Sequence, residues 1–397
     1  MLIVAPFCGT NPLLAQWVQT SGTSGTIVYA IAVSGMNLFA GINGGGVFLS
    51  TDNGTSWTVV NSGLTETGVF ALTGSGTNLF AGTFGSGVFH STNSGTNWTA
   101  VNSGLTNNGV NALALVGTNL FAGTRYGGVF LSADSGKSWT PVDSGLTNLL
   151  IFSFGVSGTN LFAGTAAGIF RTTNNGTTWT AIDSGLTNQS VHCFVVGGTS
   201  LYAGTSGGVF RTTNNGTSWT ADNSGLTNTT VNSLAASGTN IVAGTGGGVF
   251  LSTNNGTSWT AINSGLTNTV VYSLAFSGTN LFAGNSSGAV WRRPMSEIFT
   301  AVADRQNDIP AHSELHQNYP NPFNPSTRID FATPERGLVS LRVFDVLGKE
   351  IATLANGQFE AGFHRITFDA SRLSSGIYFY RLSAGESVLI KKLVLLK

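Results

Sequence analysis

The chain carries little charge: 9% of its 397 residues are Asp, Glu, Lys or Arg, against about 25% in an average domain. Its 17 basic and 17 acidic residues balance, so the formal net charge is zero. Nucleic-acid binding and polybasic membrane anchoring both need a basic surface, so the sequence argues against both. It contains no run of 18 or more apolar residues, and we expect no transmembrane segment.

Cysteine is almost absent, and the two thiols provide neither a disulfide framework nor a metal site. Cys8 lies near the N-terminus and Cys193 in a predicted inner strand. No spaced cluster of Cys and His accompanies them, so we expect no metal and no cofactor. Glycine is abundant, with 54 copies, while 41% of residues are hydrophobic and 10% aromatic. This composition predicts an all-β protein with many tight turns and a buried core.

The charged residues are unevenly distributed along the chain. Residues 17–293 hold 12 of them, whereas residues 294–397 hold 22. This shift predicts a domain boundary. At the other end, the apolar segment 1–15 finishes in Leu-Leu-Ala before Gln16, which favours an export signal. The segment lacks the basic start of a usual signal, so an ordinary terminal segment or a misassigned start codon is the alternative.

Internal repeats determine the predicted fold. A Leu-Phe-Ala-Gly motif, or a close variant, recurs every 40 or 41 residues. Its seven copies begin at Leu38, Leu79, Leu120, Leu161, Leu201, Ile241 and Leu281. Each repeat divides into four strand-like runs separated by Gly- and Asn-rich turns, which in the sixth repeat are 231–236, 240–244, 248–253 and 258–263. This pattern predicts a seven-bladed β-propeller over residues 16–293.

The last repeat lacks a fourth strand, because none follows the third-strand run 290–293. The segment 17–20 resembles a fourth strand, since Trp17 precedes the tryptophan of the first complete repeat, Trp57, by 40 residues. We therefore expect the N-terminal strand to pair with the third strand near Val290. Such pairing would close the ring, bury Trp17 and remove an open sheet edge.

A second repeated motif has the form Ser-x-Asp-x-Gly-x-x-Trp. It is clear at Asp52 and Asp134, whereas Asn replaces Asp in the other copies. The Asx and Trp positions are Asp52, Trp57, Asn93, Trp98, Asp134, Trp139, Asn174, Trp179, Asn214, Trp219, Asn254 and Trp259. The motif resembles the Asp box of sialidases and related bacterial-neuraminidase-repeat propellers. The resemblance implies a turn between the third and fourth strands of each blade.

The expected role of this turn is structural. The Asx oxygen can accept backbone N–H bonds, Gly supplies a positive φ, and Trp packs between blades. Asn keeps the acceptor, so its replacement of Asp is tolerated. Calcium binding is the weaker alternative, because each copy has at most one carboxylate.

The same resemblance raises the question of glycosidase activity. A sialidase needs three clustered arginines, a Tyr paired with a Glu, and a further acid, whereas Glu66 is the one glutamate of the predicted propeller. Glycoside hydrolysis in general needs two carboxylates about 5–10 Å apart. The six propeller acids are dispersed among the repeats, so we predict no catalytic residues and no enzyme activity. A sialidase-like glycoside hydrolase is the alternative.

The predicted ligand surface lies at one mouth of the central channel, on the face opposite the Asp-box turns. The second residue of the first strand varies from blade to blade while its neighbours stay nearly constant. These residues are Tyr29, Phe70, Asn111, Phe152, His192, Asn232 and Tyr272, and the turns between second and third strands add Phe84, Arg125 and Tyr126. Aromatic residues at a rim suit stacking on sugars or an interface hot spot. Relaxed packing at a partly exposed position is the alternative.

Residues 294–314 form a predicted linker, and a small antiparallel β-sandwich is predicted beyond it. Its expected strands are 327–331, 339–345, 350–355, 362–368, 377–383 and 388–395. Residues 315–397 resemble the type A C-terminal sorting domain of the bacterial type IX secretion system. The matching motifs are Tyr-Pro-Asn-Pro-Phe-Asn-Pro at 319–325, Val-Phe-Asp-Val-Leu-Gly at 343–348, Ala-Gly-Phe-His at 361–364, Ser-Gly-Ile-Tyr-Phe-Tyr-Arg-Leu at 375–382 and Lys-Lys-Leu at 391–393.

The resemblance implies Sec export, an outer-membrane translocon of the type IX system as a partner, and a final location outside a Gram-negative cell or on its outer membrane. The sequence therefore predicts a secreted or surface-bound propeller that binds a glycan or a protein. A passive surface-layer or spacer role is a further alternative.

Overall fold

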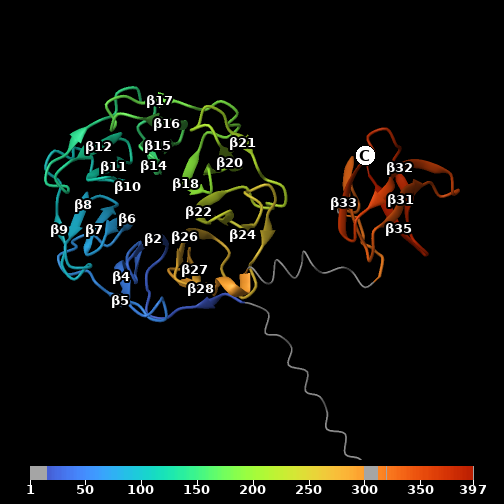
Figure 1. The fold of residues 1–397 in the computed structure, drawn as a ribbon, viewed down its shortest axis with the longest axis horizontal. Coiled ribbons are helices and arrows are strands. Elements are labelled where there is room, and N and C mark those ends of the chain that lie inside the picture. Colours follow the sequence, from blue (N-terminus) through green and yellow to red (C-terminus); the bar gives the residue numbers. More distant parts are fainter. Residues whose placement is uncertain (1–15, 299–311, 319, 397) are drawn as a thin grey trace, which may run out of the picture. The chain divides into compact units, whose positions relative to one another are not determined.

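The computed structural model describes residues 16–298, 312–318 and 320–396, and the predicted export signal lies outside them. The chain divides into two compact units, Met1–Ile298 and Phe299–Lys397. In the first unit, seven four-stranded antiparallel sheets surround a common centre (Figure 1). The predicted seven-bladed propeller is thus confirmed. Within the described ranges, no helix has the length and apolar character needed to cross a membrane.

Four strands build each blade, from the channel outward. The first strands are β2 (Val28–Ser34), β6 (Val69–Ser75), β10 (Val110–Val116), β14 (Ile151–Ser157), β18 (Val191–Gly197), β22 (Val231–Ser237) and β26 (Val271–Ser277). The second strands are β3 (Asn37–Ile42), β7 (Asn78–Thr83), β11 (Asn119–Thr124), β15 (Asn160–Thr165), β19 (Ser200–Thr205), β23 (Asn240–Thr245) and β27 (Asn280–Asn285).

The outer two strands of each blade are shorter. The third strands are β4 (Gly46–Ser50), β8 (Val88–Ser91), β12 (Val129–Ser132), β16 (Gly168–Thr172), β20 (Gly208–Thr212), β24 (Gly248–Ser252) and β28 (Val290–Pro294). The fourth strands are β5 (Thr58–Val59), β9 (Thr99–Ala100), β13 (Thr140–Pro141), β17 (Thr180–Ala181), β21 (Thr220–Ala221), β25 (Thr260–Ala261) and, for the last blade, β1 (Val18–Gln19).

The Leu-Phe-Ala-Gly motif forms the buried second strand of each blade. In β7, every residue after Asn78 is buried, because neighbouring blades cover both faces of the sheet. The glycine of the motif permits this close packing: a Cβ on Gly82 would lie 2.7 Å from Cγ1 of Val110 in the next blade. The hydrophobic clusters accordingly extend across blade boundaries, and one of them joins Phe39 of the first blade to Trp98 of the second.

The fourth strands are shorter than the sequence predicts. The run expected at 258–263 forms strand pairing only over Thr260–Ala261. Beyond it, the Ile262 N–H donates to the carbonyl of Val249, and the Asn263 side-chain oxygen accepts the Val249 N–H at 2.7 Å. A side chain therefore replaces the next backbone partner and ends the ladder.

Both ends of the propeller chain meet in the last blade. β1 pairs antiparallel with β28, with Val18 opposite Arg292 and Gln19 opposite Trp291. The Thr20 N–H extends this pairing by donating to the Val290 carbonyl at 2.9 Å. The predicted closure of the ring by the N-terminal strand is confirmed.

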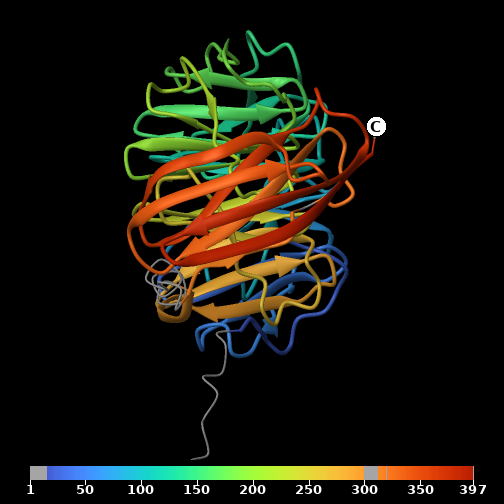
Figure 2. The same cartoon turned by 90° about the vertical axis from the view of Figure 1, so that its right-hand side faces the viewer.

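The second unit contains the two packed sheets predicted for a sandwich. One sheet has the order β29 (Glu314–Leu315), β30 (Ser326–Thr333), β33 (Gly362–Asp369). The other has the order β32 (Glu350–Phe359), β31 (Gly337–Phe344), β34 (Gly376–Ala384), β35 (Ser387–Leu395). Figure 2 shows these strands in orange to red. Phe331 of the first sheet and Leu382 of the second share one core. The predicted linker 294–314 lies largely outside the described residues.

Candidate functional site at the channel mouth

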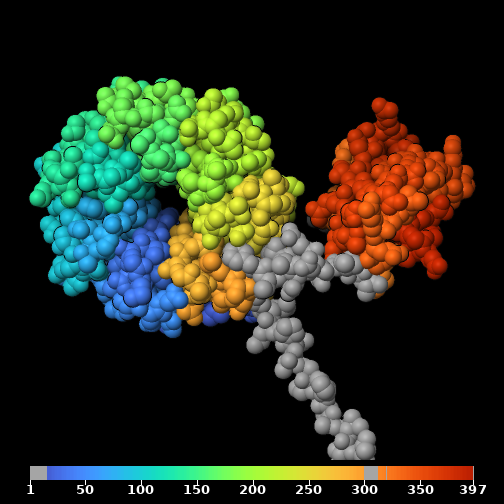
Figure 3. All heavy atoms as spheres, in the orientation of Figure 1, coloured from blue at the N-terminus to red at the C-terminus, as the bar shows by residue number. Residues whose placement is uncertain are grey.

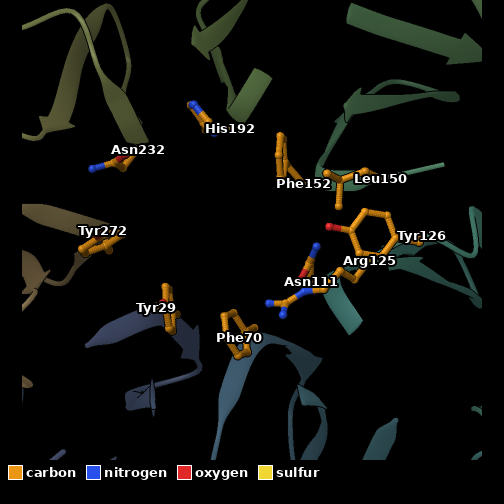
Figure 4. A pocket seen from close by; sticks show the side chains of 10 residues that line it. All are labelled: Tyr29, Phe70, Asn111, Arg125, Tyr126, Leu150, Phe152, His192, Asn232 and Tyr272. Atoms are coloured by element: carbon orange, nitrogen blue, oxygen red, sulfur yellow. The ribbon is translucent and has the colours of Figure 1, made fainter. Parts of the chain in front are cut away.

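One mouth of the propeller channel forms a pocket of about 490 Å³. Space-filling atoms leave this centre hollow in Figure 3, and Figure 4 shows side chains arranged around it. The lining residues are Tyr29, Phe70, Asn111, Arg125, Tyr126, Leu150, Phe152, His192, Asn232 and Tyr272. The structure therefore brings together every predicted rim residue except Phe84, and it adds Leu150. A second, smaller cavity of about 260 Å³ is lined by residues of the first strands.

A β-bulge explains why the second residue of each first strand reaches the mouth. In β6, Val69 pairs with Thr83 and Ala71 pairs with Gly82, so Phe70 between them has no partner in the register. The same irregularity occurs in all seven first strands. Bulges redirect a side chain relative to its strand. The sequence showed the variability of this position but gave no signal for the bulge.

Three aromatic residues of the pocket, Tyr29, Phe70 and Tyr272, form one contiguous group on the first, second and last blades. The rings of Tyr29 and Phe70 stack with centroids 4.3 Å apart, and Tyr272 meets Tyr29 edge-on at 5.5 Å. Phe84 lies next to Phe70, with ring centroids 5.7 Å apart. Burial is the main reason that the pKa of Tyr29 is raised, and the neighbouring Tyr272 raises it further. The phenol of Tyr29 therefore stays protonated at neutral pH.

Polar side chains on the other blades are held by hydrogen bonds. Asn111 and Asn232 each donate an amide N–H to a backbone carbonyl of the next blade, at 3.0 and 2.9 Å. The Nε2 atom of His192 lies 2.8 Å from the Ser206 hydroxyl, and its ring packs against Phe152 at 5.4 Å. Burial lowers the pKa of His192, so the imidazole is neutral at pH 7.

Arg125 is the only formally charged residue that lines the pocket. Its backbone N–H donates to the Gly109 carbonyl at 2.8 Å, which fixes the turn. The guanidinium lies 4.3 Å from the ring centroid of Phe84 and 5.4 Å from that of Phe70. These cation–π contacts hold the side chain in the mouth. Phe84, which does not itself line the pocket, therefore orients Arg125.

The turns that contain the Ser-x-Asx-x-Gly motif have the predicted local geometry. The Asp52 carboxylate accepts N–H bonds from Thr55 and Ser56 at 3.0 and 2.9 Å, and Gly54 has φ of 73°. Hydrogen bonds from Ser56 are the main reason that the pKa of Asp52 falls to about 2. One feature was missed: Asn53, before the glycine, also has a positive φ, of 57°.

The tryptophans of these turns connect neighbouring blades. The indole N–H of Trp98 donates to the Val60 carbonyl at 2.8 Å, and Trp139 binds Val101 in the same way at 2.7 Å. The equivalent tryptophans Trp179, Trp219 and Trp259 repeat the pattern around the ring. No group of three or more Cys, His, Asp or Glu that suits a metal ion occurs in the described ranges.

The acids of the propeller perform local structural tasks, and none lines the mouth. Glu66 accepts the Gly68 N–H at 2.9 Å, as Asn107 does for Gly109 in the next repeat. Asp183 accepts the Ile169 N–H at 2.7 Å. Asp222 forms an ion pair of 2.6 Å with Arg211.

In the C-terminal unit, the motif that begins at residue 319 is tied to the sheet of β34 and β35. The Tyr380 hydroxyl donates to the His316 carbonyl at 2.7 Å and accepts the Asn318 N–H at 2.8 Å. Asn321 accepts the Val394 N–H at 2.8 Å, and the Phe323 N–H donates to the Val394 carbonyl. The segment thus covers the C-terminal half of the β35 edge.

Comparisons with known proteins agree with this division of the chain. Residues 317–396 match the family model of the secretion system C-terminal sorting domain, and residues 152–293 match that of the DUF6242 β-propeller domain. No curated protein sequence matches the chain.

Solved structures similar to this chain include the extracellular domain of BT4673 from B. thetaiotaomicron, with 19% identity, a TM-score of 0.61, and 88% of this chain and 48% of that chain covered. PorZ, a surface component of the type IX secretion system of Porphyromonas gingivalis, has 17% identity and a TM-score of 0.56, with 96% and 61% covered. The GH74 enzyme of Niastella koreensis has 15% identity and a TM-score of 0.59, with 96% and 75% covered.

At these identities the likeness is one of fold, and the chain spans about half the length of the BT4673 domain. The match to the sorting domain shows more than a fold, because its family model covers nearly the whole C-terminal sandwich. The chain is therefore a β-propeller with a C-terminal sorting domain of the type IX secretion system, which directs it to the cell surface or outer membrane of a Gram-negative bacterium.

Proposed function

We propose that the propeller is a saccharide-binding module that acts outside the cell, with its binding site at the channel mouth. One observation carries this proposal. Seven equivalent positions, one in each blade, hold large side chains of differing chemistry, and the bulges of the first strands aim all seven into one pocket. A position that varies among otherwise similar blades and faces one shared pocket is what we expect of a ligand site.

The chemistry of the lining favours a saccharide. Four of the seven positions are aromatic, and Tyr126 adds a ring that is 70% exposed. Flat rings offer their faces to the C–H surfaces of sugars, while Asn111, Asn232 and the tyrosine hydroxyls supply polar groups that orient a ligand. The pocket is open and broad, which suits a chain or terminus of a polysaccharide.

We further propose that binding proceeds without hydrolysis. A hydrolase of either stereochemical class needs two facing carboxylates, whereas no acid lines the mouth. Glu66 and Asp183 accept backbone N–H bonds, and Asp222 pairs with Arg211. Similarity of fold to a GH74 enzyme keeps a glycoside hydrolase as the second candidate. Loss of polymer length during incubation with the chain would favour that candidate.

The test is a glycan array probed with the full chain and with the Tyr29→Ala/Tyr126→Ala variant. We expect the chain to bind a defined set of saccharides and the variant to lose at least ten-fold in affinity. The matched control is Tyr378→Ala, which removes a tyrosine from the C-terminal unit and is expected to bind like the wild type. If the wild-type chain binds nothing on the array, or if it and the Tyr29→Ala/Tyr126→Ala variant bind equally well, the proposal is contradicted. A protein ligand or a spacer role would then be favoured.

A further inference from the structure

We infer that the saccharide recognised at the channel mouth is anionic, and that Arg125 binds its negatively charged group. This inference rests on the proposed function and specifies the ligand's chemistry. It concerns sugars that carry a carboxylate or a sulfate ester. Both groups present several negatively charged oxygen atoms that accept hydrogen bonds. Such groups are bound well by the fork of N–H donors that a guanidinium presents.

The first argument is the missing partner of Arg125. The other four arginines of residues 16–293 all donate to protein acceptors within the described part of the chain. Arg171 donates to the Asn215 carbonyl, Arg211 to Asp222, Arg292 to the Asn53 carbonyl and Arg293 to the Ile262 carbonyl. The guanidinium of Arg125 makes no hydrogen bond or ion pair with any described residue, although the residue is partly buried.

The second argument is the local charge. No carboxylate lines the mouth, so none of the lining residues supplies a counter-charge to Arg125. A neutral ligand would leave a partly desolvated cation without a counter-charge, whereas an anionic group would pair with it. Burial raises the pKa of Tyr29 and lowers that of His192, so these two lining residues add no charge at pH 7.

The third argument is preorganisation. The guanidinium carbon lies 4.3 and 5.4 Å from the ring centroids of Phe84 and Phe70, and these cation–π contacts use none of its N–H donors in a hydrogen bond. Figure 4 shows the guanidinium pointing toward the centre of the mouth. Within this chain, the positions equivalent to Phe84 and Arg125 in the last four blades are Ala166, Ser206, Gly246 and Ser286. The third blade therefore carries a cation at this position, held by a ring of the second blade, and the last four blades have no counterpart.

A neighbouring aromatic ring would hold a bound sugar beside Arg125. Tyr126 follows Arg125 in the same turn and is largely exposed, so a ring stacked on Tyr126 would hold its substituent near the guanidinium. Carboxylates of uronic acids and sulfate esters both project from a sugar ring. The site therefore selects for charge as well as for the sugar surface.

The experiment measures binding of the full chain to four polymers in two matched pairs at low salt. The pairs are polygalacturonate with its methyl ester, and dextran sulfate with dextran. We expect at least ten-fold tighter binding to the charged member of one pair or both. Arg125→Gln should remove that preference, and Arg125→Lys should keep part of it. Arg171→Gln is the matched control, because Arg171 is held by a backbone carbonyl, and it should bind like the wild type.

Each possible result supports or overturns the anionic assignment. Equal affinity for charged and neutral polymers, or a preference that survives in Arg125→Gln, would overturn the anionic assignment while the saccharide proposal stands. Binding to none of the four polymers, with binding to poly-glutamate that Arg125→Gln abolishes, would place the carboxylate in a protein ligand and overturn both. Binding to none of these would also overturn the anionic assignment, and the glycan array then decides the saccharide proposal. A preference confined to one charged polymer would tell carboxylate from sulfate.

Discussion

The indole N–H of Trp17 donates a hydrogen bond of 2.7 Å to the carbonyl oxygen of Ile262, which lies 245 positions later in the chain. Trp17 is almost fully buried, and its own backbone N–H donates to the Ser264 carbonyl. These bonds repeat for the last blade the link that tryptophans make between the other blades. The N-terminal segment thus closes the ring.

The closure predicts a large effect of Trp17→Ala. Removing a buried tryptophan destabilises a fold by about 3–5 kcal/mol, because apolar contacts are lost and a cavity remains. All eight tryptophans of the sequence lie in the propeller, so tryptophan fluorescence in urea follows this unit and not the sandwich. Val18→Ala, at a residue that is 57% exposed, serves as the control and should change stability by less than about 0.5 kcal/mol. An unchanged transition in Trp17→Ala would disprove the closure.

A pair of glycines separates backbone strain from packing. Gly54 and Gly117 both have positive φ, of 73° and 61°. A Cβ on Gly117 would have no atom within 4 Å. Gly117→Ala should therefore lower the free energy of unfolding only by the cost of a positive φ in alanine, about 1–2 kcal/mol. Gly54→Ala would push its Cβ against the ring of Phe282 in the preceding blade, so we expect a further loss of about 1–3 kcal/mol. Equal losses for the two variants, measured by urea unfolding, would show that the blades are not tightly packed at this turn.

The two aspartates of the repeated turns predict a dependence on acid. The pKa values of Asp52 and Asp134 fall from 3.8 to about 2, mainly through hydrogen bonds from the serines four residues later. The folded state therefore binds fewer protons than the unfolded chain in this range. Their stabilisation is complete above about pH 4 and is lost as the pH falls through about 2.

The double variant Asp52→Asn/Asp134→Asn tests this dependence. It should fold normally at pH 7, since Asn174 and Asn214 occupy the same position and bond Thr178 and Ser218. Between pH 4 and pH 2, the wild type should lose more propeller stability than the variant. Parallel curves over this range would mean that the turns do not hold the ionised carboxylates.

His192 predicts a second dependence on pH, near neutrality. Burial lowers its pKa below the ordinary 6.5, so the unfolded chain takes up a proton more readily than the propeller does. Stability should then fall as the pH drops below about 6.5. His192→Asn, which copies the residue at the equivalent position of the sixth blade, Asn232, should remove this contribution. If both proteins lose the same stability between pH 7 and pH 5, the imidazole is not buried as described.

Much of the fold could be predicted from the sequence because its cause is repeated seven times. A Leu-Phe-Ala-Gly strand, a glycine turn and a tryptophan recur at fixed spacing, and the missing fourth strand identified Trp17 as the closing residue. The rim was predictable because the blades of one chain can be compared. The bulge beside Phe70, the positive φ of Asn53 and the place of Leu150 were not, since they arise from backbone geometry that no residue type specifies.

Hydrogen exchange of the full chain with and without a saccharide found on the array tests the central claim most directly. Exchange slows where a ligand covers or stiffens the backbone. We expect slower exchange in peptides that cover residues 124–128 and 149–153 at the mouth, and no change in those that cover the turn 51–57 on the opposite face. Protection of the 51–57 turn and its equivalents, with the mouth unaffected, would contradict a binding site at the channel mouth.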